Sequence, residues 1–151
     1  MKNKGMRIRH PKARGEWAEM CFLPRATEEG LRVSKPWGDN DSYDVVTEYR
    51  RKFNRVQVKC TIYMVRGAYV CRVAASHVPY TIDQIDFIAA YVIPIDTWYI
   101  LPLKAVEGQE SIVLTPDLKG SKYWKYREAW HPPENLIRSE EDLRERGGTQ
   151  A

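Results

Sequence analysis

Two runs of alternating apolar and polar side chains, separated by a short basic segment, constrain the fold of this chain more than any other feature. They cover residues 43–49 and 55–62, and the residues between them are RRKFN. Alternation with a period of two is typical of β-strands that are buried on one face. We therefore predict a β-hairpin over residues 42–59, with the RRKFN segment as its connection.

The second strand of this hairpin places Gln57 and Lys59 on one face, because successive side chains of a strand point to opposite faces. The other face holds the apolar side chains Val56, Val58 and Cys60. Asp44 lies one residue into the first strand, where a carboxylate is costly unless a cation or hydrogen-bond donors meet it. We expect these polar side chains to form a cluster at the open end of the hairpin.

An aspartate, an amide and an amine in one cluster suit metal-dependent cleavage of a phosphodiester. A divalent cation offsets the negative charge of the substrate, and a lysine can orient or deprotonate the attacking water. Mg²⁺ is the expected ion, with Mn²⁺ as a substitute, because its ligands are oxygen atoms and retained waters. Asp44, the Gln57 amide and the Val58 carbonyl would bind the metal, and Lys59 would supply charge or act as general base. The same spacing also fits an ordinary strand with an exposed polar face, and the spacing alone does not choose between the two interpretations.

Composition sets the size and the character of the protein. The chain has 151 residues, 43% of them hydrophobic, which suits one globular domain with its own core. The formal net charge of +4 favours an anionic partner. Three cysteines without CxxC spacing indicate neither a disulfide framework nor a zinc site. The longest apolar run, near residues 87–95, is too short to span a bilayer, and no signal peptide is recognisable. We expect a soluble cytoplasmic protein that associates with the nucleoid.

The remaining elements follow from periodicity and from glycine and proline. Residues 1–10 form a basic arm, expected to be disordered in the free protein, residues 11–130 form the domain, and residues 131–151 form a charged tail. A helix is predicted over residues 11–29, with a kink or break at Pro24 and Gly30 just after its end. Further strands are predicted over residues 67–74, 87–93, 98–103 and 111–114, and the second and third of these should pair as a hairpin. A short amphipathic helix is predicted over residues 121–130, docked on the core or in contact with DNA.

Three segments carry a more specific resemblance: RGEWAEMCFLPRATEEGLRVSKPWGDNDSYDVV, RVQVKCT and YTIDQIDFIAAYVIPIDTWYILPLKAV. Across residues 14–106 the chain resembles the PD-(D/E)XK endonucleases, which include group I intron homing endonucleases, and it is more distantly similar to archaeal Holliday-junction resolvases. The resemblance implies an α/β, restriction-endonuclease-like αβββαβ core with a central mixed sheet. It also implies a metal site formed by a helix glutamate, an aspartate and an (E/Q)xK motif. These match Glu16, Asp44, Gln57 and Lys59. The wider family has glutamate where this chain has Gln57, which removes one negative charge from the site.

Double-stranded DNA is the expected substrate of such an enzyme. Basic residues that could contact phosphates lie on the helix, in the following loop and at the hairpin tip: Arg14, Lys35, Arg50, Arg51, Lys52 and Arg55. Cutting both strands of a palindromic site needs two active sites, so a homodimer or homotetramer is expected.

Four functions remain open at this point. The first is a Mg²⁺-dependent, homing-endonuclease-like enzyme, and the second is a Holliday-junction or structure-specific resolvase. The third is a DNA-binding module on an inactive nuclease scaffold, and the fourth is a structural protein with an acidic partner.

Overall fold

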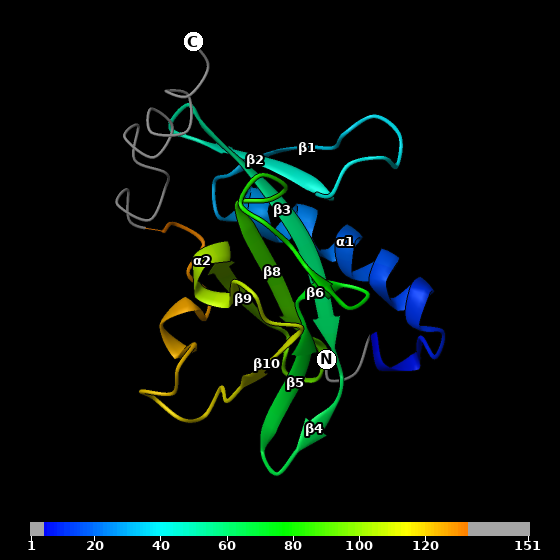
Figure 1. Cartoon of the computed structure of the whole chain (residues 1–151), viewed down its shortest axis with the longest axis vertical. Coiled ribbons are helices and arrows are strands. Elements are labelled where there is room, and N and C mark those ends of the chain that lie inside the picture. Colours follow the sequence, from blue (N-terminus) through cyan, green and yellow to red (C-terminus); the bar gives the residue numbers. More distant parts are fainter. Residues whose placement is uncertain (1–4, 133–151) are drawn as a thin grey trace.

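The protein is built on a five-stranded mixed sheet with one long helix against it (Figure 1). The computed structural model describes residues 5–132. In chain order the elements are η1 (Gly5–Arg7), α1 (Pro11–Glu28), β1 (Arg32–Ser34), β2 (Val45–Tyr49), β3 (Lys52–Thr61), β4 (Met64–Val65), β5 (Ala68–Arg72), β6 (Ala74–Ala75), β7 (Val78–Pro79), β8 (Phe87–Val92), η2 (Ile93–Ile95), β9 (Thr97–Pro102), α2 (Leu103–Val106), β10 (Ser111–Leu114) and η3 (Trp124–Tyr126).

The central sheet has the strand order β1-β2-β3-β8-β9. Neighbouring strands are antiparallel except β3 and β8, which run parallel. β8 and β9 are buried at every residue, although β9 is an edge strand, because both faces of the sheet are covered there. The expected α/β class with a central mixed sheet is confirmed, as is the pairing of β8 with β9.

α1 covers one face of this sheet. Its buried residues Arg14, Ala18, Phe22 and Ala26 recur every four positions and so form one stripe on the helix. The prediction allowed a kink or a break at Pro24, and the break is wrong because the helix continues through this residue. Gly30 has φ +84°, and its N–H and that of Leu31 donate to the carbonyls of Thr27 and Ala26, which ends the helix as the sequence predicts.

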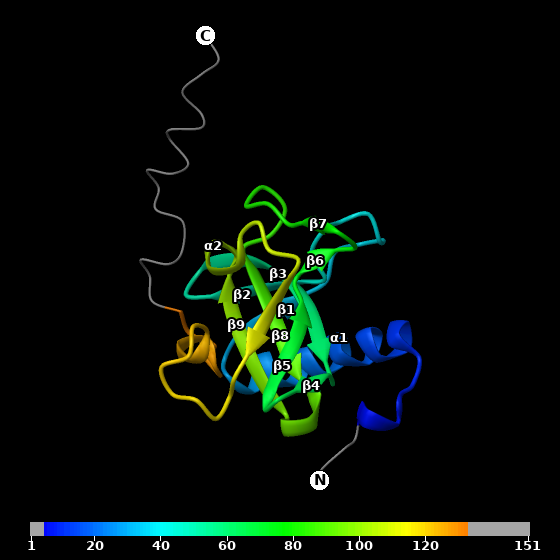
Figure 2. The same cartoon turned by 60° about the horizontal axis from the view of Figure 1, so that its bottom comes forward.

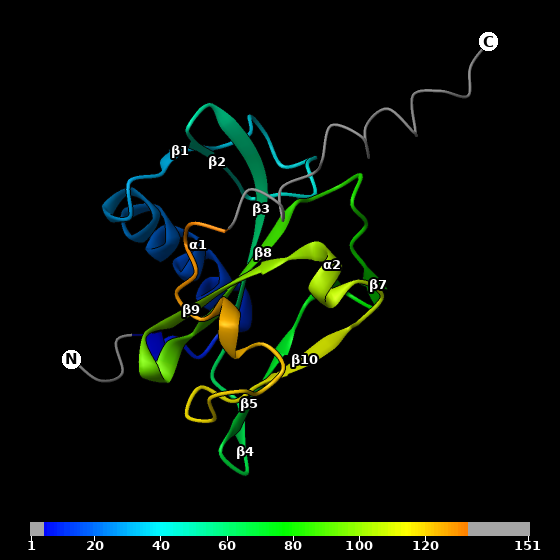
Figure 3. The same ribbon diagram turned by 90° about the vertical axis from the view of Figure 1, so that its left-hand side faces the viewer.

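The opposite face is covered by a smaller sheet with the order β10-β5-β4, as Figures 2 and 3 show. Two separate hydrophobic clusters result. On the helix side Ala18 and Phe22 lie among Val45, Val58 and Trp98. On the other side, residues of β8 and β9 pack with residues of the small sheet: Ile88, Ala90, Tyr99 and Leu101 with Tyr69, Cys71, Ile112 and Leu114.

The connection between the parallel strands β3 and β8 differs from the expected αβββαβ order. Residues 62–86, all within the described part of the chain, contain β4 to β7 and no α-helix. The strand predicted over residues 67–74 is present as β5, which belongs to a tight hairpin: β4 pairs with β5 across Arg66 and Gly67, both at positive φ. The four-residue helix α2 instead follows β9.

The predicted hairpin is present, but its turn is shorter than expected. β2 and β3 pair antiparallel from Val45 with Val56 to Tyr49 with Lys52, so only Arg50 and Arg51 form the connection. Both have positive φ, 49° and 66°, as a two-residue type I′ turn requires. The sequence does not predict this turn, because type I′ turns usually contain glycine or asparagine rather than two arginines. The residues Lys52 to Asn54 therefore belong to β3.

Two predictions near the ends of the domain are wrong. Residues 121–130 contain only the three-residue helix η3, because Glu128 adopts a positive φ and its N–H donates to the Trp98 carbonyl of β9. The described part of the N-terminal arm, residues 5–10, has a defined backbone rather than the expected disorder: it begins with η1, and Arg14 donates to the carbonyls of Ile8 and Arg9. Gly5 is buried so closely against Trp17 that a β-carbon there would lie 2.3 Å from the indole ring. Residues 1–4 and the predicted tail beyond residue 132 lie outside the described residues.

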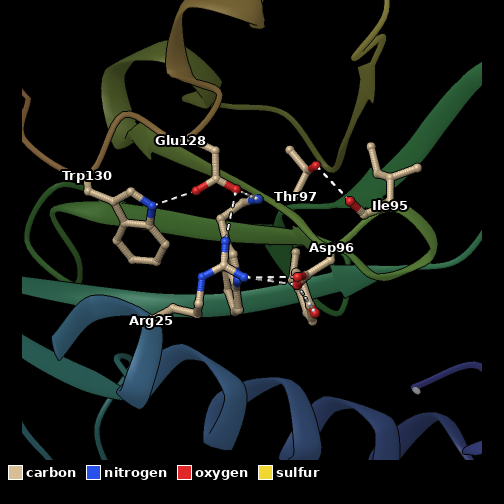
Figure 4. A network of polar contacts seen from close by, with 8 residues as sticks. Arg25, Ile95, Asp96, Thr97, Glu128 and Trp130 are labelled. Atoms are coloured by element: carbon tan, nitrogen blue, oxygen red, sulfur yellow. Dashed lines mark hydrogen bonds and ion pairs between the residues drawn. The ribbon is translucent and has the colours of Figure 1, made fainter. Parts of the chain in front are cut away.

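A polar network fixes the segment after η3 to the rest of the domain (Figure 4). Arg25 of α1 donates to both carboxylate oxygens of Asp96 at 3.1 Å and forms an ion pair with Glu128 at 3.5 Å. Glu128 also accepts hydrogen bonds from the Trp98 N–H at 2.9 Å and from the Trp130 indole N–H at 2.7 Å. One carboxylate thus joins α1, β9 and the chain leading to Trp130.

Candidate active site

Asp44 is held at the edge of β3 just before β2 begins. Its N–H donates to the Val56 carbonyl at 2.9 Å, and one of its carboxylate oxygens accepts the Val58 N–H at 2.8 Å. This second bond satisfies a backbone donor that has no strand partner, because β2 starts only at Val45. The N–H and C=O of one strand residue point to the same side, so the Val58 carbonyl also faces Asp44.

Glu19 of α1 is the helix carboxylate that meets Asp44. Burial, a hydrogen bond with the Asp44 side chain and repulsion from its charge raise the pKa of Glu19 from 4.5 to about 7. Lys35 opposes this shift, and Glu16 adds to it. Two carboxylates this close cannot both ionise without cost unless a positive charge lies between or beside them.

Gln57 and Lys59, both half-buried, flank Val58, the β3 residue whose N–H donates to Asp44. Their neighbours Val56 and Val58 are buried in the cluster under α1, so Gln57 and Lys59 face the other side of the sheet, as the alternation predicts. The Lys59 Nζ lies 5.3 Å from the centre of the Tyr80 ring. Asp44, Gln57 and Lys59 are therefore brought to one end of the hairpin.

The donor set fits a hard divalent cation. Within residues 5–132 no group of three histidine, cysteine, aspartate or glutamate side chains is arranged to hold a metal ion. The available ligands are instead two carboxylates, Glu19 and Asp44, together with the Gln57 amide and the Val58 carbonyl. Oxygen ligands in small number, with waters filling the remaining positions, are the usual surroundings of Mg²⁺ in proteins.

Comparison with known proteins decides the family. The sequence model of the PD-(D/E)XK endonuclease family matches residues 9–133. The chain belongs to this family. Its members generally use divalent metal ions, and the resemblance read from the sequence is confirmed.

Two solved structures are similar to this PD-(D/E)XK protein. The bacterial homing endonuclease I-Ssp6803I has a TM-score of 0.70 and 28% sequence identity, over 90% of this chain and 98% of the other. The Holliday-junction resolvase Hjc of Archaeoglobus fulgidus has a TM-score of 0.48 and 16% identity, over 72% of this chain and 86% of the other. No curated protein matches. The chain is thus a nuclease by its family.

The helix carboxylate that contacts Asp44 in this PD-(D/E)XK protein is Glu19 rather than Glu16. Glu16, selected from the sequence, is exposed and lies one turn before Glu19 on the same helix. Glu19 is half-buried, and the Asp44 side chain raises its pKa. Sequence reasoning missed Glu19, although it lies directly after the buried Ala18, at the border of the apolar stripe, whereas Glu16 lies outside it.

The guanidinium groups of two basic residues selected for DNA contact bond within the protein. Arg14 is only 8% exposed, and it donates to the carbonyls of Ile8 and Arg9. Arg55 forms an ion pair with Asp86 at 3.1 Å. The remaining four residues are exposed: Lys35, Arg50, Arg51 and Lys52.

A cavity of about 290 Å³ lies elsewhere, on the helix side of the hairpin near its tip. Its walls include Phe22, Tyr49, Lys52 and Trp130. The residues of the candidate active site do not line it: Glu19, Asp44, Gln57 and Lys59. This cavity is therefore separate from the candidate active site.

No helix among the described residues is long and apolar enough to cross a membrane.

The carboxylate pair makes stability depend on pH. With the pKa of Glu19 raised from 4.5 to about 7, the folded protein binds more protons than the unfolded chain between these values, so stability falls as the pH rises through this window. In EDTA, we expect Glu19→Gln to be more stable than the wild type at pH 7.5 by about 1 kcal/mol, a figure reduced for solvent screening.

Thermal unfolding at pH 4.5 and pH 7.5 measures this effect. The advantage of Glu19→Gln should shrink at the lower pH, where the wild-type carboxyl is protonated. The exposed Glu16→Gln serves as the matched control and should show a smaller difference. A wild-type protein that equals or exceeds Glu19→Gln in stability at pH 7.5 would contradict the raised pKa.

Proposed function

We propose that this nuclease is a Mg²⁺-dependent endonuclease that cuts double-stranded DNA in the manner of a homing endonuclease. The observation that carries the proposal is the Glu19–Asp44 carboxylate pair, which the Val58 N–H ties to the strand that carries Gln57 and Lys59. The 28% identity to a homing endonuclease over 98% of that protein's length supports the same activity.

The residues of the site have separate tasks in this proposal. Asp44, Glu19, the Gln57 amide and the Val58 carbonyl hold the cation, and Glu19 takes the place that the sequence suggested for Glu16. A bound Mg²⁺ or Mn²⁺ would polarise the scissile phosphate and lower the cost of forming hydroxide from water. Lys59 either stays an ammonium, which orients the attacking water and offsets the charge of the phosphate, or reacts as the neutral amine and receives a proton from that water. The hydrogen bond from Val58 fixes the Asp44 carboxylate in advance, so little reorganisation is needed when substrate arrives.

The exposed basic residues give the DNA-binding surface. Arg50, Arg51 and Lys52 lie together at the hairpin tip, and Lys35 lies in the loop between β1 and β2, near Glu19. These side chains would neutralise phosphates and position the duplex with its backbone at the carboxylate pair. Two copies of the chain, as a homodimer or within a homotetramer, would bring one site to each strand.

Incubation of purified protein with three DNA substrates tests this function. The substrates are a plasmid library with randomised inserts, a linear duplex and a cruciform, each with Mg²⁺, with Mn²⁺ or with EDTA. We expect double-strand cuts at a shared sequence in the library, and only when a divalent cation is present. Cutting restricted to the cruciform would indicate a resolvase. Binding without any cutting would indicate a DNA-binding module on a nuclease scaffold.

A further inference from the structure

Lys59 has a neighbour that neither the metal site nor the DNA surface explains. Its ammonium nitrogen lies 5.3 Å from the centre of the Tyr80 ring, within the range of a cation–π interaction. Tyr80 is only 8% exposed and belongs to the cluster between the two sheets, with Ile85, Ile88 and Ala90. The ring is therefore fixed by packing, whereas the lysine side chain has four rotatable bonds and is only half-buried.

The segment that follows Tyr80 is tied to β3 close to the active site. Arg55 donates to the Asp83 carbonyl at 2.6 Å and to the Ile82 carbonyl at 2.8 Å, and its guanidinium also contacts both carboxylate oxygens of Asp86 at 3.1 Å. The Arg55 N–H donates to Asp86 as well, at 2.8 Å, and its carbonyl accepts the Asp86 N–H at 2.9 Å. Arg55 is two residues before Gln57 and four before Lys59 on the same strand.

The turn itself is closed by its own hydrogen bonds. The Thr81 N–H donates to the Gln84 side-chain oxygen at 3.0 Å, and the Thr81 carbonyl accepts the N–H groups of Gln84 and Ile85. Ile85 is fully buried. The backbone on the C-terminal side of Tyr80 is therefore attached to β3 by Arg55 and to the core by Ile85.

We propose that Tyr80 is a positioning residue for Lys59, and that the contacts of Arg55 with residues 82–86 hold the Tyr80 ring in place for this purpose. The inference rests on the proposed function for its consequence in catalysis, although the contact itself does not. In this proposal Arg55 acts at the active site by holding the segment after Tyr80, and not by contacting phosphate. The π-face of the ring attracts the ammonium and limits where the nitrogen can lie, so Lys59 meets the attacking water in one position.

The position of Lys59 can be measured without any cleavage reaction. With ¹³Cε-labelled lysine, an aromatic ring this close should shift the Lys59 Hε resonances upfield of those of the other lysines. The signal is assigned by its loss in Lys59→Met. We expect Tyr80→Phe, which keeps the ring, to retain the upfield shift and Tyr80→Leu, which removes the ring, to abolish it. An unshifted wild-type signal, or an equal shift in Tyr80→Leu, would overturn the proposal.

The wild type, Tyr80→Phe and Tyr80→Leu are then compared in single-turnover cleavage. For Tyr80→Leu the rate at saturating DNA and Mg²⁺ should fall roughly tenfold, with the half-saturating DNA concentration within about twofold of the wild type. Tyr80→Phe should cut within about twofold of the wild-type rate. A Tyr80→Leu protein that cuts at the wild-type rate, or a Tyr80→Phe protein as slow as Tyr80→Leu, would count against a positioning ring. If the wild type cuts no substrate, the proposed function fails, and the resonance of Lys59 still decides whether Tyr80 positions it.

Discussion

Replacement of Asp44 by asparagine is expected to lower the rate of DNA cleavage by at least about a thousandfold, because it removes the charge that holds the cation opposite the scissile phosphate. Asparagine has nearly the same shape, and its side-chain oxygen can still accept the Val58 N–H that the aspartate accepts at 2.8 Å. The fold should therefore be retained. Single-turnover cleavage in Mg²⁺ measures the rate.

Two controls separate this effect from unfolding or loss of DNA binding. The thermal midpoint of Asp44→Asn should not fall below that of the wild type, since the substitution also relieves repulsion with Glu19. Affinity for DNA measured in Ca²⁺ or EDTA should remain within a few-fold of the wild type. Cleavage by Asp44→Asn at more than a tenth of the wild-type rate would show that another carboxylate holds the metal.

Replacement of Lys59 by methionine should reduce the cleavage rate by about a hundredfold to a thousandfold, because the site then loses the group that would supply either the positive charge or the proton acceptor. Methionine keeps much of the length and the apolar stem of lysine, so packing against the Tyr80 ring is preserved. The measurement is again single-turnover cleavage at saturating Mg²⁺. The rate at saturating DNA and the DNA concentration that gives half this rate are determined separately.

Lys59→Arg and Lys52→Met are the informative comparisons. Arginine keeps the charge but not the proton-accepting ability, so a partial rate in Lys59→Arg would indicate that charge is the larger contribution. Lys52 is an exposed lysine on the same strand, near the hairpin tip. Its replacement should weaken DNA binding without lowering the rate at saturation. An unchanged rate in Lys59→Met would remove lysine from the mechanism.

The hairpin and its polar face could be predicted from the sequence because both depend on one physical rule. Alternation over residues 55–62 places Gln57 and Lys59 together on any strand, whatever lies around it. The buried strand β8 and the Gly30 helix end are equally local, since an apolar run and a positive-φ residue carry their own signal. Elements of this kind can be predicted without knowledge of the tertiary structure.

Other features depend on contacts between distant residues and could not be predicted in this way. Residues 121–130 have helical spacing of aromatics, but Glu128 bonds to β9 and Arg25 and draws the chain out of a helix. Charge alone groups Arg14 and Arg55 with the surface cations. In the structure both guanidinium groups donate to backbone carbonyls, and that of Arg55 also forms an ion pair with Asp86. The helix rotation that brings Glu19 rather than Glu16 to Asp44 is set by how Ala18 and Phe22 pack on the sheet.

The central claim, that Glu19 and Asp44 together hold the catalytic cation, is tested most directly by titrating Mg²⁺ in single-turnover cleavage with Glu19→Gln and Glu16→Gln. The two variants make the same chemical change one helical turn apart. We expect Glu19→Gln to raise the Mg²⁺ concentration for half-maximal rate at least tenfold, and Glu16→Gln to leave it within about twofold of the wild type. The reverse order, or an equal effect of both variants, would contradict this account of the site.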